Sequence, residues 1–223
     1  MSITGLFLIM FLGMHLSVNM FLLFSEEAFN RAAHFMGTNP LIRVVEPLLA
    51  IGFVVHILYA GYITLKNKQF RPTGFDKTKR LVGSSWASQN MFVLGAIIFI
   101  GILIHMRHFF FHMKLVGMPL DMLGEGMISY GGETMHNAYL LIISLFQNWY
   151  FTALYVIWAI LLGIHISHGF WSAFQTLGFS NNIWRKRLTL VSRIFAVIFG
   201  VGFSIIPLYF LLFFDYEAYI AIF

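Results

Sequence analysis

Long apolar runs separated by short polar segments dominate this sequence. Five of the runs reach the roughly 20 residues that a helix needs to cross a hydrocarbon core of about 30 Å. They lie at about 3–24, 42–65, 88–112, 149–176 and 188–214. The chain is 59% hydrophobic and only 10% charged, a composition that a soluble domain could not keep away from water. We therefore predict an all-α integral membrane bundle of five transmembrane helices that forms a single domain over residues 1–223.

Two local features refine this pattern. The apolar start has no basic lead-in, so we interpret it as the first span rather than a signal peptide. We leave open that the native chain begins upstream of this first residue. The apolar run before the fourth span is too long for one crossing, and Gln147, Asn148, Trp149 and Tyr150 resemble an interfacial break. We expect residues 139–146 to lie along the membrane surface.

Charge predicts the orientation of the bundle. Ten of the 14 basic residues follow the second span or surround the fourth connection: Lys66, Lys68, Arg71, Lys77, Lys79, Arg80, Arg185, Lys186, Arg187 and Arg193. Of the nine acidic residues, only Asp76 joins them. The positive-inside rule then places the N-terminus in the cytoplasm and the C-terminus outside. Topology also accounts for the pI of about 9.6, so nucleic acid is not an expected partner.

Four histidines, His15, His56, His105 and His165, lie one in each of the first four spans. An ionisable or metal-binding side chain at membrane depth is costly, and it usually marks a functional site. Because the chain has no cysteine, iron–sulfur ligation and covalent c-type heme attachment are excluded. Any heme must be held non-covalently, and one histidine per span favours two pairs of axial ligands for two hemes.

The depth of each histidine in the membrane predicts how they pair. We take this depth from the helical rise of about 1.5 Å per residue. His56 and His165 lie about nine and eleven residues before the inner ends of spans that run inward. His15 and His105 lie about nine and seven residues before the outer ends of spans that run outward. We therefore predict two stacked sites, with His56 and His165 on the inner iron and His15 and His105 on the outer iron.

Small residues flank three of these histidines by one helical turn: Gly52, Ala60, Gly101 and Gly169. Such positions either leave room for a flat macrocycle or let helices pack closely. His108 and His112 extend the face of His105, and His168 lies one turn beyond His165. We treat these three as secondary candidates. Arg107 is either a heme-propionate partner or a side chain that reaches toward the interface.

At these residues the chain resembles the diheme cytochrome b anchor of succinate:quinone oxidoreductases, a family that includes the quinol:fumarate reductases. Four segments carry the resemblance, from Gly5 to about Gly178: GLFLIMFLGMHLSVNMFLLFSEEAFN around His15, Glu46 and His56 with the following AGYI, the Gly95 to His105 spacing, and HISHGFWS from His165. Each motif alone identifies the family only weakly. The four motifs in this order, within a chain of five spans, identify it more specifically.

The resemblance implies a membrane-anchor subunit with two b hemes on the same four histidines. It implies two partners on the cytoplasmic face, a flavoprotein that interconverts succinate and fumarate and an iron–sulfur protein. Electrons would pass between the iron–sulfur centres, the two hemes and a quinone, expected to be menaquinone. The setting would be a bacterial inner membrane, in a respiratory chain or the tricarboxylic acid cycle. This chain has no flavin or dicarboxylate motif, so that chemistry belongs to a partner.

One departure from the family is plain. Some members carry a glutamate two residues before the fourth-helix ligand, where it is implicated in transmembrane proton transfer. Here that position is Gly163, so the pathway is not carried over.

Three alternatives stay open. Another diheme cytochrome b, serving a hydrogenase or nitrate reductase, would typically place its ligands on fewer helices. A di-iron oxygenase or desaturase would use His105, His108 and His112 with His165 and His168, but would leave His15 and His56 unexplained. A transporter with a histidine proton relay would not need histidines paired in depth.

Overall fold

The computed structural model describes residues 1–70, 86–116, 126–179 and 181–221. Its elements, in chain order, are α1 Ser2–Met20, the 3-10 helix η1 Phe21–Leu23, α2 Glu26–Thr38, α3 Pro40–Gln69, α4 Trp86–Gln89, α5 Met91–His105, the π-helix η2 Met106–Val116, β1 Met127–Tyr130, β2 Glu133–His136, α6 Ala138–Phe146, α7 Trp149–Thr176, α8 Asn182–Leu212 and α9 Tyr216–Ile220.

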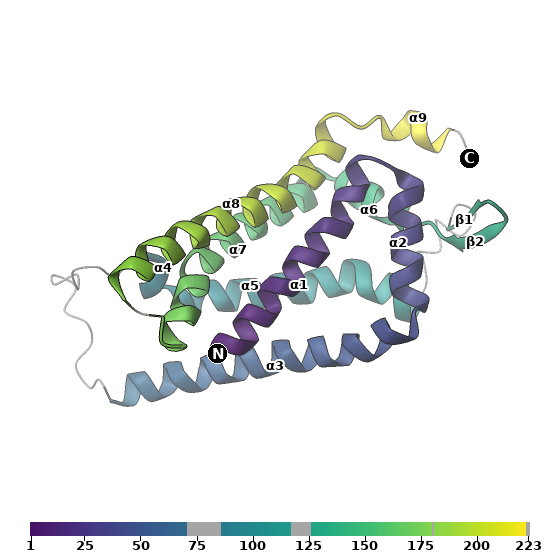
Figure 1. The fold of residues 1–223 in the computed structure, drawn as a ribbon. Helices are drawn as coiled ribbons and strands as arrows, with labels where there is room; N and C mark the ends of the chain where they lie inside the picture. The colour runs from purple at the N-terminus through teal and green to yellow at the C-terminus, as the bar shows by residue number, and fades with distance from the viewer. Residues whose placement is uncertain (71–85, 117–125, 180, 222–223) are drawn as a thin grey trace.

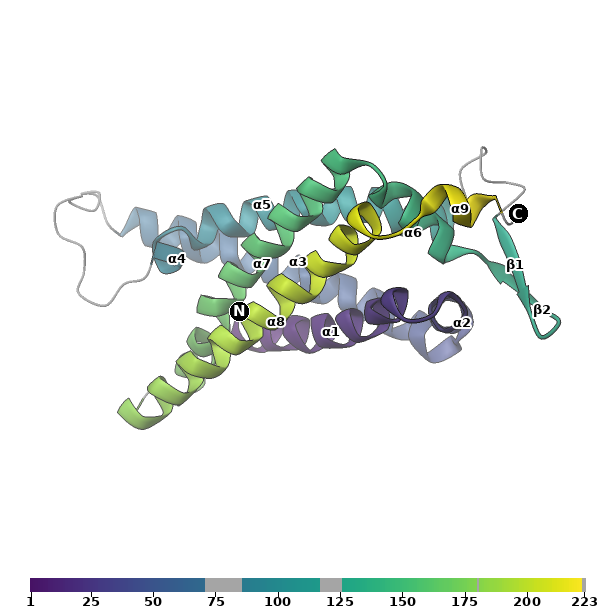
Figure 2. The ribbon, with the colours of Figure 1, turned by 90° about the horizontal axis from the view of Figure 1, so that it is seen from above.

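The predicted all-α architecture with five membrane-crossing helices is confirmed (Figure 1). The helices that are long and apolar enough to span a bilayer are Ser2–Leu23, Pro40–Gln69, Met91–Lys114, Trp149–Thr176 and Asn182–Leu212. Seen from above, the short elements α2, α6, α9 and the hairpin β1–β2 gather at one end of the bundle (Figure 2). We call this end, opposite the start of α1, the capped end.

Asparagines begin three of the long helices. The side chains of Asn39, Asn148 and Asn181 accept hydrogen bonds from backbone N–H groups in the first turns of α3, α7 and α8. Such caps satisfy donors that have no partner within the helix. The cap at Asn148 explains why the apolar run from 139 breaks there.

The helix α6 is covered by the rest of the protein. We expected residues 139–146 along the membrane surface; within the protein, Leu140 and Ile143 of this segment are fully buried. The helix packs against α2, α7 and α8, and Gln147 anchors its end by donating to the carbonyl of Phe210 at 2.8 Å. The polar break was recognised correctly, but which elements cover the segment depends on contacts distant in sequence.

Two other local features concern a proline inside a helix and a short hairpin. Because α3 begins at Pro40, Pro47 lies inside the helix, where its missing N–H leaves the carbonyl of Arg43 without its usual donor. The hairpin β1–β2 was missed. Its signal was the pair Gly131 and Gly132, whose φ angles of 62° and 86° suit a tight two-residue turn.

A buried polar network holds the capped end together. The Asn30 amide donates to Oδ1 of Asn137 at 3.1 Å, and both side chains are fully buried. Asn137 Oδ1 also accepts from the backbone N–H of Leu140, and its amide donates to Tyr219. The Tyr219 hydroxyl in turn donates to Glu26 at 2.7 Å. Burial raises the pKa of Tyr219 well above its ordinary value of 10, so the phenol remains a donor at neutral pH.

We expect Asn137→Leu to destabilise the protein by about 2 kcal/mol, because it leaves the Asn30 amide and the Leu140 N–H buried without their acceptor. Thermal unfolding in detergent measures the loss. The matched control is Asn90→Leu, since the Asn90 amide bonds only to the Trp86 carbonyl one turn away at an exposed site. Equal losses in the two variants would contradict the network's role.

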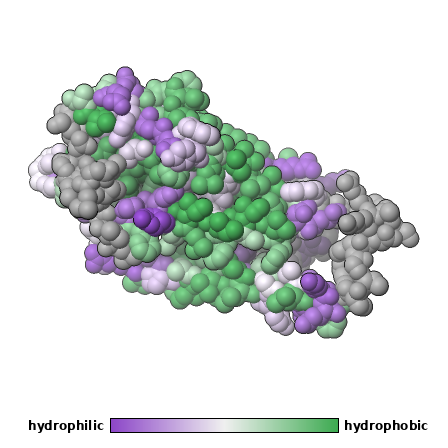
Figure 3. All heavy atoms as spheres, turned by 180° about the vertical axis from the view of Figure 1, so that it is seen from behind, coloured by the Kyte–Doolittle hydropathy of each residue, from purple (hydrophilic) through white to green (hydrophobic). Residues whose placement is uncertain are grey.

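Charge is distributed between the two ends of the bundle. Lys66, Lys68 and the basic residues 185–187 lie at the ends of α3 and α8 away from the capped end, while Glu26 and Glu133 belong to the capped end. Seen from behind, the middle of the molecule is apolar and hydrophilic residues lie mainly toward its ends (Figure 3). The remaining basic residues of the predicted inner loop, at 71–80, lie outside the described residues.

Candidate functional site: two histidine pairs between the long helices

The outer pair is formed by His15 on α1 and His105 at the end of α5. Their ring centroids lie 5.8 Å apart and the ring planes are nearly perpendicular, at 87°. Two imidazoles on opposite sides of one metal ion, with bonds of about 2.0–2.1 Å, would have ring centres roughly 6 Å apart. The structure thus brings the two predicted outer ligands to a separation that suits one iron between them.

Aromatic side chains surround the outer pair. Phe11 stacks on His15 at 5.4 Å, and Phe203 of α8 lies 5.8 Å from the same ring. Trp158 of α7 lies 5.8 Å from His105, and its indole N–H donates to the carbonyl of Ile98. These groups keep water from the pair and lower the local dielectric constant.

The inner pair draws on all of the first four spans. His56 lies on α3 and His165 lies on α7. On α1, Thr4 lies 3.2 Å from Nδ1 of His56. A Cβ built at Gly5 would be 3.5 Å from the His56 ring, and one at Gly95 of α5 would be 3.9 Å from the His165 ring. The backbone of α1 thus lies close to the His56 ring, and that of α5 lies close to the His165 ring.

Two observations on the histidines fit a cofactor. All four histidines are half-buried as residues, although each lies within a membrane-crossing helix. The Nδ1 atoms of His105 and His165 are buried without a hydrogen-bond partner. Polar atoms buried in a protein core normally have a hydrogen-bond partner. Around His56, α3 contributes one buried residue, Gly52, so its inward face is not closed by side-chain packing.

The small residues near these histidines do not act alike. A side chain at Gly52 would meet the Phe7 ring at 3.0 Å, and the place of a side chain at Gly101 is taken by the Trp158 indole. Both are therefore helix-packing positions. Around Gly169 nothing lies within 4 Å, and Ala60 is half-buried.

The secondary histidines do not form one cluster. After His105 the helix continues as the π-helix η2, which changes the face on which later residues lie. His108 lies 3.1 Å from the Tyr155 hydroxyl, while His112 lies 2.8 Å from exposed Arg107. His168 packs edge-on against Trp171 on its own helix. Arg107 thus lies at the surface and contacts a histidine of its own segment.

No three His, Cys, Asp or Glu side chains converge to hold a metal ion within the part of the chain that the structure describes. A b heme needs only two protein ligands per iron, because the macrocycle supplies the other four. The separation of His15 and His105 meets that smaller requirement.

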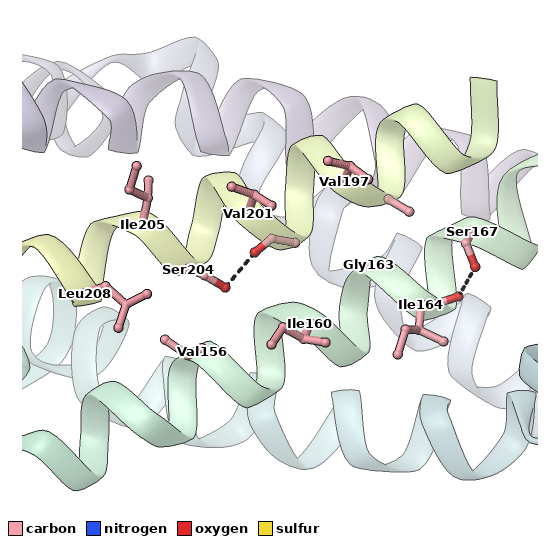
Figure 4. A pocket seen from close by; sticks show the side chains of 12 residues that line it. Val156, Ile160, Gly163, Ile164, Ser167, Val197, Val201, Ser204, Ile205 and Leu208 are labelled. Carbon is pink, nitrogen blue, oxygen red and sulfur yellow. Dashed lines mark hydrogen bonds between the residues drawn. The ribbon is translucent and has the colours of Figure 1, made fainter. Parts of the chain in front are cut away.

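A separate apolar cavity of about 580 Å³ lies along the crossing of α7 and α8 (Figure 4). Its only polar side chains, Ser167 and Ser204, donate to carbonyls of their own helices. Beside them Gly163 allows a close approach, since a Cβ there would lie 2.7 Å from the carbonyl oxygen of Ala196. This contact leaves no room for a larger side chain at position 163.

Comparison with models of known protein families, with curated proteins and with solved structures finds no match.

Proposed function

We propose that this protein is the membrane-anchor cytochrome b subunit of a succinate:quinone oxidoreductase or quinol:fumarate reductase. It would carry electrons between an iron–sulfur partner and membrane quinone, for which we expect menaquinone. The observation that carries the proposal is the contact between His15 and His105, whose ring centroids lie 5.8 Å apart, with one further histidine in each of the second and fourth spans.

In this proposal His15 and His105 hold the outer heme, and His56 and His165 hold the inner one. When bound, the two hemes supply one-electron carriers at two depths of the membrane. With two histidines holding each heme, the site would suit electron transfer rather than oxygen activation. Phe11, Phe203 and Trp158 exclude water from the outer pair and so influence its potential.

Charge supports the placement of the partners. The end with Lys66, Lys68 and residues 185–187 would face the cytoplasm of a bacterial cell and receive the iron–sulfur protein, with the flavoprotein beyond it. The capped end and the C-terminus would then lie outside. Dicarboxylate chemistry would belong to the flavoprotein, and this subunit would only exchange electrons with quinone.

The proposal predicts two b hemes per chain. A pyridine hemochrome assay on purified protein counts them, and a reduced-minus-oxidised spectrum identifies the heme type. Protein without heme, when it is expressed with a heme supply and folds as judged by circular dichroism, would overturn the proposal.

A further inference from the structure

A threonine hydroxyl contacts one of the four intramembrane histidines. Oγ1 of Thr4, in the first turn of α1, lies 3.2 Å from Nδ1 of His56 on α3. The same hydroxyl donates to the backbone carbonyl of Met1 at 2.9 Å. Gly5 next to it brings the backbone of α1 close to the His56 ring.

The hydrogen-bond network assigns the proton between these two groups. A threonine hydroxyl has one proton and two lone pairs. Because the hydroxyl donates to Met1, its oxygen offers a lone pair to His56. In the tautomer that we assign, Nδ1 of His56 carries the hydrogen, so the lone pair of the neutral ring is on Nε2. That tautomer leaves Nε2 free to bind a metal.

The other three histidines lack an equivalent acceptor among the described side chains. The Nδ1 atoms of His105 and His165 have no partner. The amide nitrogen of Asn19, a donor, lies 3.4 Å from Nδ1 and 3.5 Å from Nε2 of His15, and it also bonds the His15 carbonyl at 2.8 Å. The Thr4 contact therefore distinguishes the inner pair from the outer one.

We infer that Thr4 is a positioning residue for the inner heme, which fixes the tautomer and orientation of His56 through its hydroxyl. This rests on the proposed function. An acceptor on the second ring nitrogen makes a histidine ligand more basic and holds its plane. A more basic ligand stabilises the oxidised iron, so the hydroxyl lowers the midpoint potential of the inner heme.

The test compares three variants of the full chain by spectroscopic redox titration and by heme content. Thr4→Val keeps the shape and removes the hydroxyl, whereas Thr4→Ser keeps the hydroxyl. The matched control is Thr64→Val, two turns beyond His56 on α3, because the Thr64 hydroxyl bonds only to the carbonyl of Ala60. We expect Thr4→Val to raise one of the two midpoint potentials and to weaken retention of that heme about tenfold. Thr4→Ser should restore both values and Thr64→Val should change neither.

The outcomes separate this inference from the proposed function. Wild-type protein without heme overturns both. Two hemes with unchanged potentials and retention in Thr4→Val overturn the role of Thr4 and leave the proposed function intact. A similar shift in Thr64→Val, or failure of Thr4→Ser to restore the potential, would show an effect of packing and would also overturn the inference. A shift or loss confined to one heme and restored by serine supports it.

Discussion

His105→Ala is expected to lower the heme content from two per chain to one, and His56→Ala is expected to remove the other heme. In the proposed function each iron would depend on two protein ligands, His15 with His105 for the outer heme and His56 with His165 for the inner one. The loss of one axial ligand should therefore release one heme and spare its neighbour. The hemochrome assay measures the ratio of heme to protein, and redox titration shows which potential disappears.

Double substitutions test the pairing itself. Removing His15 together with His105 should cost no more heme than removing His105 alone, because both residues would serve one iron. Removing His56 together with His105 should abolish heme binding. His136→Ala is the control, since His136 is an exposed residue of the hairpin. If the His15 and His105 double variant lost both hemes while the protein stayed folded, the assignment of pairs would be wrong.

Gly163→Val is expected to destabilise the protein by about 3 kcal/mol. The Cβ of any residue at this position would lie 2.7 Å from the Ala196 carbonyl oxygen, and 3.4 Å from Cα of Gly200. Both contacts are backbone atoms of α8, so no flexible side chain can move aside and the two helices must separate. Overpacking of this kind typically costs 1–3 kcal/mol or more. Thermal and denaturant unfolding in detergent measure the loss.

Gly169→Val provides the matched control on the same helix. Nothing lies within 4 Å of a Cβ at Gly169, while the helical backbone and the introduced side chain are the same. Any general effect of a β-branched residue on α7 therefore appears in both variants, and their difference isolates the contact with α8. Comparable stability of the two variants would show that the α7–α8 crossing tolerates displacement.

Much of the architecture follows from sequence because a bilayer imposes local rules. An uninterrupted apolar stretch of sufficient length must form a helix, since every backbone polar group has to be satisfied within it. The spans were therefore predicted to within four residues at most ends, although α8 begins at Asn182 rather than at 188. The basic residues in its first turns lower the hydropathy there, so the apolar pattern placed the start of this helix too late. The break at Asn148 was visible for the same local reason, a polar cap between apolar runs.

The candidate site was predictable only in part. One histidine in each of four spans is a property of the sequence, and helical rise placed them at two depths. Sequence could not show that His15 faces His105 at 5.8 Å, because depth says nothing about which way a helix is rotated. Nor could it show the partner of His56, since Thr4 is 52 residues away and reaches it only through the packing of α1 against α3.

The sequence by itself determined the membrane-spanning helices, the opposite placement of basic and acidic ends, and the depth of each histidine. All three depend on composition and on rise along a single helix. Only the tertiary structure decided that α6 is buried, that Gly163 touches the backbone of α8, and that Trp158 fills the space at Gly101. These features depend on which faces of different helices meet. Which faces meet depends on side-chain packing between residues far apart in the chain, so the local sequence pattern does not predict it.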